Sequence, residues 1–317
     1  MSLAIGVDVG GTTVKAGLVA GDGTIRASTS CRTPTESAER VADAIIGTVK
    51  ALQGKASSEV AAVGIGAAGF VDADRADVLF APNLPWRHEP LRAVVAGRVG
   101  VPVVVENDAN AMAWGEHRFG AGRGAGHLVC VTIGTGIGGG IVLGGTLLRG
   151  AYGIAAEFGH MRVVPDGRRC GCGNRGCWEQ YCSAGALARA ARDLASTTPR
   201  AADRMRELAG GDMDGVTGEV ITRAAREGDR AALDCFEQVG GWLGQGLADV
   251  AATLDPARFV IGGGVIAAAD LLLAPARRRY GASLTGAGHR PLADIVAATL
   301  GNDAGIVGVA DLARQGA

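Results

Sequence analysis

The chain has 317 residues, of which 48% are hydrophobic and 20% charged, so it is long enough for two globular domains of about 150 residues each. Its net charge of −1 provides no field of one sign that would attract nucleic acid or an anionic membrane surface. No apolar run reaches the roughly 18 residues of a membrane span, and no basic stretch precedes the first apolar one, so we expect a cytoplasmic protein without a signal peptide.

Two segments share one plan, which is an apolar strand, a glycine-rich turn and a second apolar strand. They are residues 4–19, which read AIGVDVGGTTVKAGLV, and residues 127–143, which read HLVCVTIGTGIGGGIVL. The recurrence of this hairpin at domain-scale separation predicts two related domains that face a shared cleft.

Strands that alternate with helices between and after these hairpins predict an α/β fold. Apolar runs predict further strands over residues 59–66, 101–105 and 259–261. Apolar residues at helical spacing predict helices over 38–52, 186–195, 218–227 and 231–254, and a last helix that begins near Ala304. We expect residues 196–204 to form a flexible connection.

The glycine-rich turns of both hairpins suit phosphate binding. Glycine lets consecutive backbone N–H groups converge on a phosphate, and threonine hydroxyls add further hydrogen bonds. Asp8 ends the first strand, where a hydrated Mg²⁺ would bridge phosphate oxygens. An ordinary hairpin turn with a capping aspartate is the alternative for this turn alone, and the second turn weighs against it. The residues that we assign to nucleotide binding are Asp8, Gly10, Gly11, Thr12, Thr13, Thr132, Gly134, Thr135, Gly136 and Gly138.

A third glycine cluster follows the strand at 259–261, and its Gly263 and Gly264 suit the adenine or ribose face of a nucleotide. None of the three clusters matches the P-loop pattern or the Rossmann fingerprint. The sequence therefore predicts ATP held between two lobes without a P-loop.

Asn107 and Asp108 follow an apolar strand directly, at the strand end where open α/β sheets bind ligands. A sugar hydroxyl is a poor nucleophile, so phosphoryl transfer needs a carboxylate that orients it and accepts its proton. We assign this role to Asp108 and a neighbouring sugar hydroxyl to Asn107. The alternative is that either residue merely caps the following helix, although one can cap while the other catalyses.

A cluster of thiols and one imidazole follows the pattern H-x9-C-x-C-x4-C. Its residues His160, Cys170, Cys172 and Cys177 complete a tetrahedral Zn²⁺ site without an open position, as structural zinc sites do. Free buried cysteines are the alternative. A DNA-binding zinc ribbon is disfavoured because the loop carries only a small basic patch.

The zinc loop also carries acceptors for sugar hydroxyls. Glu157 and His160 are three residues apart and share one face of a helix or turn, and Glu179 lies just beyond Cys177. Zinc would fix these groups on a rigid frame, and His160 would bind metal through one ring nitrogen and sugar through the other.

The segments DVGGTT, ENDANA, TIGTGIGGG, EFGH and CGCGNRGCWEQY occur in the order of the ROK family, which the whole chain resembles, and within it the chain is most similar to actinobacterial-type glucokinases. The resemblance implies an actin-like, hexokinase-type (ribonuclease H-like) fold with a cleft between a small and a large lobe. The small domain would comprise residues 1–111 and 301–317, and the large domain residues 112–300 with a zinc-binding loop at about 160–182 and a helical segment.

The activity that the resemblance implies is phosphorylation of glucose to glucose 6-phosphate in glycolysis, with ATP and Mg²⁺, a structural Zn²⁺, and Asp108 as the base. A homodimer or a dimer of dimers is the family's usual assembly. The sugar ligands that the resemblance implies are Gly69, Asn83, Asn107, Asp108, Glu157, His160 and Glu179.

The sequence departs from the family pattern at two places. Thr13 occupies the position after the DxGGT motif where the family often has lysine, and Lys15 follows two residues later, so a phosphate contact from Lys15 is left open. Ala68 occupies a position that is usually proline, which makes the loop before Gly69 less rigid.

Three alternatives differ from a glucose kinase. The acceptor is another hexose, such as fructose, mannose or an N-acetylhexosamine, or the donor is polyphosphate. The third is a sugar-sensing regulator, which is disfavoured because we see no helix-turn-helix segment before the first strand and because Asp8, Asp108 and both phosphate loops are present.

Overall fold

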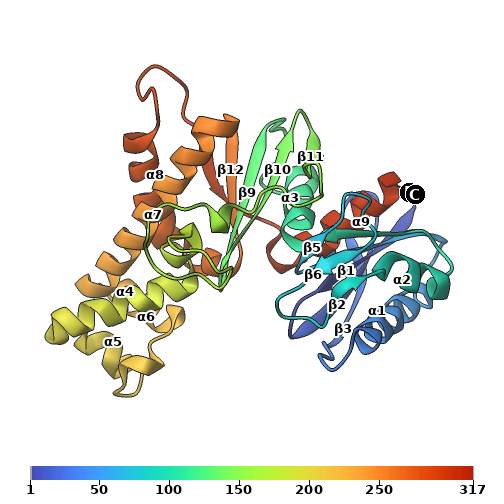
Figure 1. Cartoon of the computed structure of the whole chain (residues 1–317), viewed down its shortest axis with the longest axis horizontal. Coiled ribbons are helices and arrows are strands. Elements are labelled where there is room, and N and C mark those ends of the chain that lie inside the picture. Colours follow the sequence, from blue (N-terminus) through green and yellow to red (C-terminus); the bar gives the residue numbers. More distant parts are fainter. Residues whose placement is uncertain (1, 317) are drawn as a thin grey trace. The chain divides into compact units, whose positions relative to one another are not determined.

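In a computed structural model, which describes residues 2–316, the chain divides into two compact units (Figure 1). Unit 1 comprises Met1–Cys130, Gly139–Ala156 and Ala298–Ala317, and unit 2 comprises Val131–Gly138 and Glu157–Ala297. Each unit combines sheet strands with helices, which confirms the predicted α/β class.

Unit 1 contains a five-stranded sheet of order β3-β2-β1-β4-β8. Its strands are β1 (Leu3–Val9), β2 (Thr13–Val19), β3 (Ile25–Arg32), β4 (Val60–Ala67) and β8 (Val103–Asn107). β1 runs antiparallel to β2 and parallel to β4, which in turn runs parallel to β8. A small three-stranded sheet of order β5-β6-β7 consists of β5 (Phe70–Val71), β6 (Val78–Phe80) and β7 (Arg87–Glu89).

Helices cover both faces of the larger sheet. They are α1 (Ala38–Gln53), α2 (Leu91–Val99), α3 (Asp108–Phe119) and α9 (Ala304–Gly316). Alternate residues of a strand point to opposite faces, and in β1 the larger apolar side chains, such as Ile5 and Val7, join the core with α1 and α2. On the other face a Cβ on Gly6 would lie 1.9 Å from the carbonyl oxygen of Ile306, so α9 packs directly on the strand backbone.

The second sheet has the order β11-β10-β9-β12-β13, and the boundary between the units crosses β9 and β10. Its strands are β9 (Leu128–Ile133), β10 (Ile137–Leu143), β11 (Thr146–Leu148), β12 (Arg258–Gly262) and β13 (Asp294–Ala297). The α-helices of unit 2 are α4 (Ala184–Thr197), α5 (Asp203–Leu208), α6 (Gly218–Arg226), α7 (Arg230–Leu254) and α8 (Ala269–Ser283). Short 3-10 helices include η1 (Phe158–His160), η2 (Trp178–Gln180), η3 (Pro199–Ala202) and η5 (Gly264–Ala268).

Both glycine-rich hairpins and all of the expected helices are present, within about two residues of their predicted ends. The expectation of a flexible connection over residues 196–204 is wrong. This stretch contains the end of α4, η3 and the start of α5, and Ala202 within it is fully buried, as is Met205 just after it. The sequence pattern does not indicate this burial, because the apolar residues here are few and stand among polar ones.

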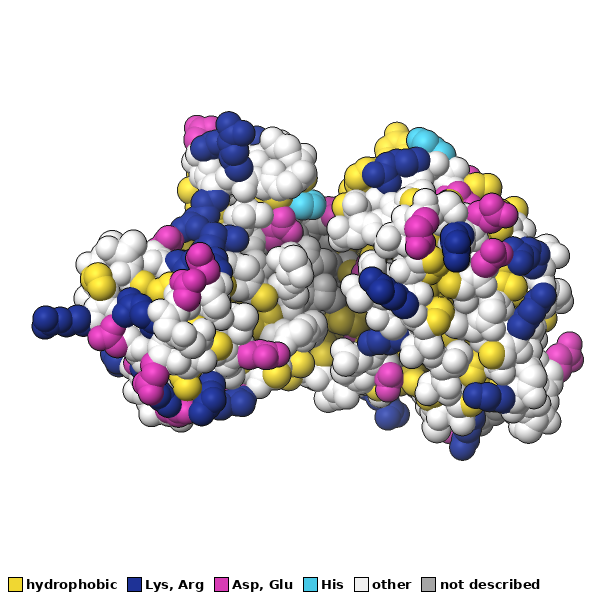
Figure 2. All heavy atoms as spheres, turned by 90° about the horizontal axis from the view of Figure 1, so that it is seen from below, with side chains coloured by type: hydrophobic (Ala, Val, Ile, Leu, Met, Phe, Trp, Pro, Cys, Tyr) yellow, Lys and Arg dark blue, Asp and Glu magenta, His cyan; other side chains and the backbone are white. Residues whose placement is uncertain are grey.

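Charges of both signs are interspersed over the surface. On the face shown in Figure 2, basic and acidic side chains alternate on each unit, in keeping with the net charge of −1. Among residues 2–316 no helix has the length and apolar character needed to cross a bilayer.

Candidate active site and metal cluster

The first glycine-rich turn closes the β1–β2 hairpin in unit 1. The amide of Gly10 donates to the carbonyl of Thr13 at 3.1 Å, and Thr33 Oγ1 donates to the carbonyl of Gly10 at 2.7 Å. A Cβ on Gly11 would lie 3.2 Å from Cβ of Asn83. The fold therefore brings Asn83, a residue assigned to sugar, against the turn assigned to phosphate.

Asp8 lies near the end of β1 and is directly paired with Lys15 of β2 in the antiparallel register. Its carboxyl group faces the first turn of α9, because a Cβ on Gly305 would lie 3.7 Å from Cγ of Asp8. Burial raises the pKa of Asp8, and the positive charge of Lys15 partly opposes this shift. A cation beside this carboxylate, such as Mg²⁺ bound with a nucleotide, would offset the cost of its desolvation.

Asn107 and Asp108 lie where β8 ends and α3 begins. Asn107 is the N-cap, and its Oδ1 accepts a hydrogen bond from the amide of Asn110 at 3.0 Å. Its Nδ2 donates to the carbonyl of Gly69 and to Oδ1 of Asp108, both at 3.1 Å. Thus Asn107 caps the helix, and Asp108, half-buried in the first turn, is oriented beside Gly69.

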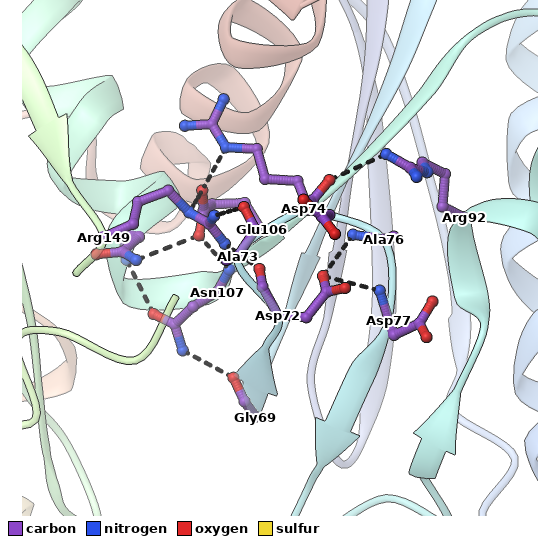
Figure 3. Close-up of polar contacts among 12 residues, drawn as sticks. Gly69, Asp72, Ala73, Asp74, Ala76, Asp77, Arg92, Glu106, Asn107 and Arg149 are labelled. Carbon is purple, nitrogen blue, oxygen red and sulfur yellow. Dashed lines mark hydrogen bonds and ion pairs between the residues drawn. The ribbon is translucent and has the colours of Figure 1, made fainter. Parts of the chain in front are cut away.

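A buried ionic network supports this helix start, and the sequence reasoning missed it (Figure 3). Glu106 has no exposed side-chain surface, and its Oε2 lies 2.8 Å from Nε of Arg149 and 3.2 Å from Nε of Arg75. Desolvation lowers the pKa of Arg75, and the carboxylate of Glu106 opposes that shift. The signal in the sequence is a glutamate that continues an otherwise apolar strand, since a buried charge requires a partner.

The second glycine-rich turn belongs to unit 2. Gly134 donates its amide to the carbonyl of Gly136 at 2.9 Å, and the amide of Gly138 donates to Oγ1 of Thr132 at 3.2 Å. The carbonyl of Gly134 accepts from the amide of Ala184 at 2.9 Å, which joins the turn to the start of α4. Thr135, at the tip of the turn, is exposed.

Two other predicted residues lie against this turn. A Cβ on Gly136 would come within 2.5 Å of Oε2 of Glu179, so that carboxylate lies directly over the turn. Gly263 has φ 86° and would place a Cβ 2.4 Å from the carbonyl oxygen of Ile133. Only glycine fits at this position, where the backbone after β12 passes the end of β9, and Gly264 begins η5.

The residues expected to bind zinc come together in unit 2. The ligand atoms of His160, Cys170, Cys172 and Cys177 all lie within 4.8 Å of one another. Cys172 Sγ and Cys177 Sγ are 3.6 Å apart, and Cys170 Sγ is 3.7 Å from Nδ1 of His160. A tetrahedral zinc with Zn–S bonds of about 2.3 Å separates its sulfur ligands by about 3.8 Å, so the cluster has the dimensions of such a site.

The protonation of the thiols also fits a metal site. Burial raises the pKa of Cys170 to about 12 and raises that of Cys177. Without a cation these buried thiols stay protonated, and a divalent ion reverses this preference. Cys182 is buried as well but lies outside the set of ligand atoms that come together.

The carboxylates assigned to sugar adjoin this cluster. Oε1 of Glu179 lies 3.0 Å from Sγ of Cys170, and Oε2 of Glu157 lies 4.0 Å from Nε2 of His160. Burial raises the pKa of Glu157, with a further rise from Glu179 and an opposing effect of His160. His160 directs Nδ1 toward the thiols and Nε2 toward Glu157. One ring nitrogen therefore faces the expected metal ligands, and the other faces a carboxylate assigned to sugar.

The predicted site residues thus form local groups within each unit. In unit 1 these are the hairpin turn with Asn83, and Asp108 with Asn107 and Gly69. In unit 2, Glu179 joins the second glycine-rich turn to the metal cluster.

Known proteins match this chain over almost its whole length. The model of the ROK family matches residues 4–316. The glucokinase of Streptomyces coelicolor is 51% identical over 315 residues, which cover 99% of this chain and 98% of that protein, and the glucokinase of Thermotoga maritima is 39% identical over 317 residues, which cover 98% and 97%.

A solved structure is similar over the same extent. It is the crystal structure of a ROK family glucokinase from Streptomyces griseus in complex with glucose and AMPPNP. It aligns with a TM-score of 0.87 and 53% identity, covering 99% of this chain and 100% of that one. The similarity confirms the actin-like, hexokinase-type fold that the family resemblance implied, and the chain belongs to the ROK family.

Proposed function

We propose that this chain is an ATP-dependent glucokinase, which transfers the γ-phosphoryl group of ATP to the 6-hydroxyl of glucose. The observation that carries the proposal is the half-buried Asp108 at the end of β8, which Asn107 holds beside Gly69. Identity of 51% to a glucokinase, and a similar structure that contains glucose and the ATP analogue AMPPNP, support this choice of substrates.

Asp108 acts as the base. Its carboxylate accepts the proton of the 6-hydroxyl as the oxygen attacks the γ-phosphorus and the bond to the leaving ADP breaks. Because Asn107 Nδ2 and the amide of Ala109 both donate to Oδ1, the carboxyl group is oriented before the sugar arrives. This orientation supports proton transfer along one direction, which lowers the entropic part of the barrier.

The two glycine-rich turns bind the phosphates. Backbone amides at the tips of the turns, those of Gly11, Thr12, Thr135 and Gly136, donate to phosphate oxygens together with the hydroxyls of Thr12, Thr13, Thr132 and Thr135, and Gly263 and Gly264 lie along the nucleoside. Mg²⁺ bound with the nucleotide would neutralise charge on the phosphates. Asp8, whose carboxylate is partly desolvated, would hold this complex through coordinated water.

The sugar is oriented by hydrogen bonds from its hydroxyls. Glu157, Glu179 and Nε2 of His160 accept or donate these bonds in unit 2, and Asn83, Gly69 and Asn107 do so in unit 1. A structural Zn²⁺ on His160, Cys170, Cys172 and Cys177 would cross-link the loop that carries Glu179. Because Oε1 of Glu179 lies 3.0 Å from Sγ of Cys170, loss of the metal would also disturb this sugar contact.

The chemistry of the site also supports a cellular compartment and a metabolic role. Clustered thiols that bind metal are typical of a reducing compartment, which supports a cytoplasmic enzyme, and glucose 6-phosphate feeds glycolysis. We also propose that this chain assembles as a homodimer or a dimer of dimers, as is usual in the family.

A panel of acceptors and donors tests the proposal in a coupled ADP-release assay. Glucose with MgATP is expected to give the highest kcat/KM, above fructose, mannose, N-acetylglucosamine and N-acetylmannosamine. A higher kcat/KM with another sugar would reassign the acceptor, and turnover with polyphosphate in place of ATP would reassign the donor. Saturable glucose binding without turnover of any acceptor would instead support a sugar sensor and contradict the proposal.

A further inference from the structure

Glu106 is a buried carboxylate beside the proposed base, and the steps above do not use it. We infer that Glu106 and Arg149 form a positioning pair that holds the segment carrying Asp108 in its reactive orientation. The inference rests on the proposed function, because it assigns these residues a role in the same phosphoryl transfer.

One oxygen of Glu106 binds a backbone amide on one side of the base and a side-chain amide on the other. Its Oε1 accepts a hydrogen bond from the amide of Asn107 at 2.9 Å and from Nδ2 of Asn110 at 3.2 Å. Asn107 precedes Asp108, and Asn110 lies in the first turn of α3. A shift of this carboxylate would therefore move the base through the peptide that carries it.

The other oxygen is held by arginine. Oε2 lies 2.8 Å from Nε of Arg149, whose side chain is 10% exposed, and 3.2 Å from Nε of the more exposed Arg75. A buried carboxylate without a partner is strongly destabilised, so removal of either arginine changes where Glu106 is most stable.

Arg149 in turn is anchored to a turn of its own unit (Figure 3). Its two Nη groups donate to the carbonyls of Ala73 at 2.7 Å and Asp72 at 2.8 Å. The same turn is closed by Oδ1 of Asp72, which accepts from the amides of Ala76 and Asp77. Arg149 therefore links Glu106, and through it Asp108, to a turn with its own internal hydrogen bonds.

A purely structural ion pair is the competing explanation, and unit 1 provides a matched control. Arg314 is 11% exposed and lies 3.1 Å from Oδ1 of Asp311, a buried carboxylate that also accepts from Nε1 of Trp114. It resembles Arg149 in burial and in its partner, but its Nη groups donate to Asp311 and to the carbonyls of Val19 and Ala20, and Glu106 is bound by other arginines. Arg314→Met thus measures what loss of a buried pair does by itself.

The experiment is a double-mutant cycle of Arg149→Met and Asp108→Asn, with Arg314→Met in parallel. Below the melting temperature of each variant, we expect Arg149→Met to lower kcat about 100-fold, since a small misplacement of a reacting group has this cost. The KM for ATP and the metal content should stay within about twofold of the wild type. The double variant should be no slower than Asp108→Asn alone, because the pair acts through Asp108.

Three results would overturn the inference. They are a folded Arg149→Met with the kcat of the wild type, effects of the two substitutions that multiply, and an equal loss of kcat in Arg314→Met. If Arg149→Met does not fold, Glu106→Gln of equal size takes its place in the cycle with the same expectations. Failure of the wild type to phosphorylate glucose would instead contradict the proposed function, so the two failures are distinguishable.

Discussion

Nδ2 of Asn107 lies 3.1 Å from Oδ1 of Asp108 and the same distance from the carbonyl oxygen of Gly69. A single amide group therefore joins the proposed base to the loop after β4. Because Asn107 also caps α3, its orientation is set by the helix and not by the substrate.

Asp108→Asn removes the proposed proton acceptor and keeps a side chain of the same size. We expect kcat to fall about 10²- to 10⁴-fold, since that is the usual contribution of a general base. The dissociation constant for glucose, measured by calorimetry, should change little. Glu59→Gln, an exposed carboxylate in the loop before β4, is the control and should keep the wild-type kcat. An Asp108→Asn enzyme with more than about a tenth of the wild-type kcat would rule out this base.

The metal cluster gives a prediction with its own control among the cysteines. Cys172→Ser removes a proposed zinc ligand that is exposed, so the apolar core is undisturbed, and we expect loss of bound zinc by atomic emission spectroscopy. The KM for glucose should rise, because Glu179 contacts the same cluster through Cys170.

Cys182→Ala is the matched variant for this test. Cys182 is fully buried near the cluster but is not one of its ligands, so zinc content should stay at one per chain even if stability falls. Equal zinc content in Cys172→Ser and the wild type would contradict the assignment.

Substitutions at two glycines of the second turn are expected to act separately, one on sugar binding and the other on nucleotide binding. In Gly136→Ala the new Cβ would lie 2.5 Å from Oε2 of Glu179, and this flexible carboxylate must move. The KM for glucose should rise about tenfold, the cost of roughly one hydrogen bond.

In Gly134→Ala the Cβ meets no protein atom within 4 Å, so folding and the KM for glucose should be unchanged. The KM for ATP should rise, because we propose that the backbone there approaches the phosphates. Steady-state kinetics with each substrate varied would check both variants, and an unchanged glucose KM in Gly136→Ala would argue against Glu179 as a sugar ligand.

Local sequence patterns predicted most of the fold, and the exceptions have physical causes. α8 was not predicted because Pro275 lies inside it, and proline normally interrupts a helix. Pro275 packs where α8 meets α7, since a Cβ on Gly240 would lie 2.5 Å from Cγ of Pro275. This close contact joins segments far apart in the sequence, so no local pattern reports it.

The residues of the candidate site also divide into those that local sequence patterns predicted and those that they did not. The zinc pattern and the Asn107–Asp108 pair were visible because their chemistry lies within short segments. The partners of Glu106 were not, because Arg75 and Arg149 come from distant loops and resemble ordinary surface arginines in the sequence. Pairing of a buried charge is decided by tertiary structure.

The last prediction concerns Asp8, for which function and stability have opposite requirements. Burial raises the pKa of Asp8 in the folded protein above its usual 3.8. As pH rises from 3.8 through the folded pKa, the unfolded chain loses its proton first, so this group makes folding less favourable, and the penalty persists at neutral pH. Asp8→Asn should therefore raise the melting temperature at pH 7 and have a smaller effect below pH 3.8, while it lowers turnover of MgATP.

Asp22→Asn is a control of opposite sign. A hydrogen bond from the amide of Thr24 lowers the pKa of the exposed Asp22, so its ionised form stabilises the fold above the usual pKa, and this contribution is lost as pH falls through the lowered value. Its removal should lower the melting temperature slightly at pH 7 and leave turnover unchanged. Scanning calorimetry from pH 3 to 8, at about one-unit steps, would check both signs. A lower melting temperature for Asp8→Asn at pH 7 would show that Asp8 stabilises the fold through its pairing with Lys15, and that the desolvation of its carboxylate does not dominate.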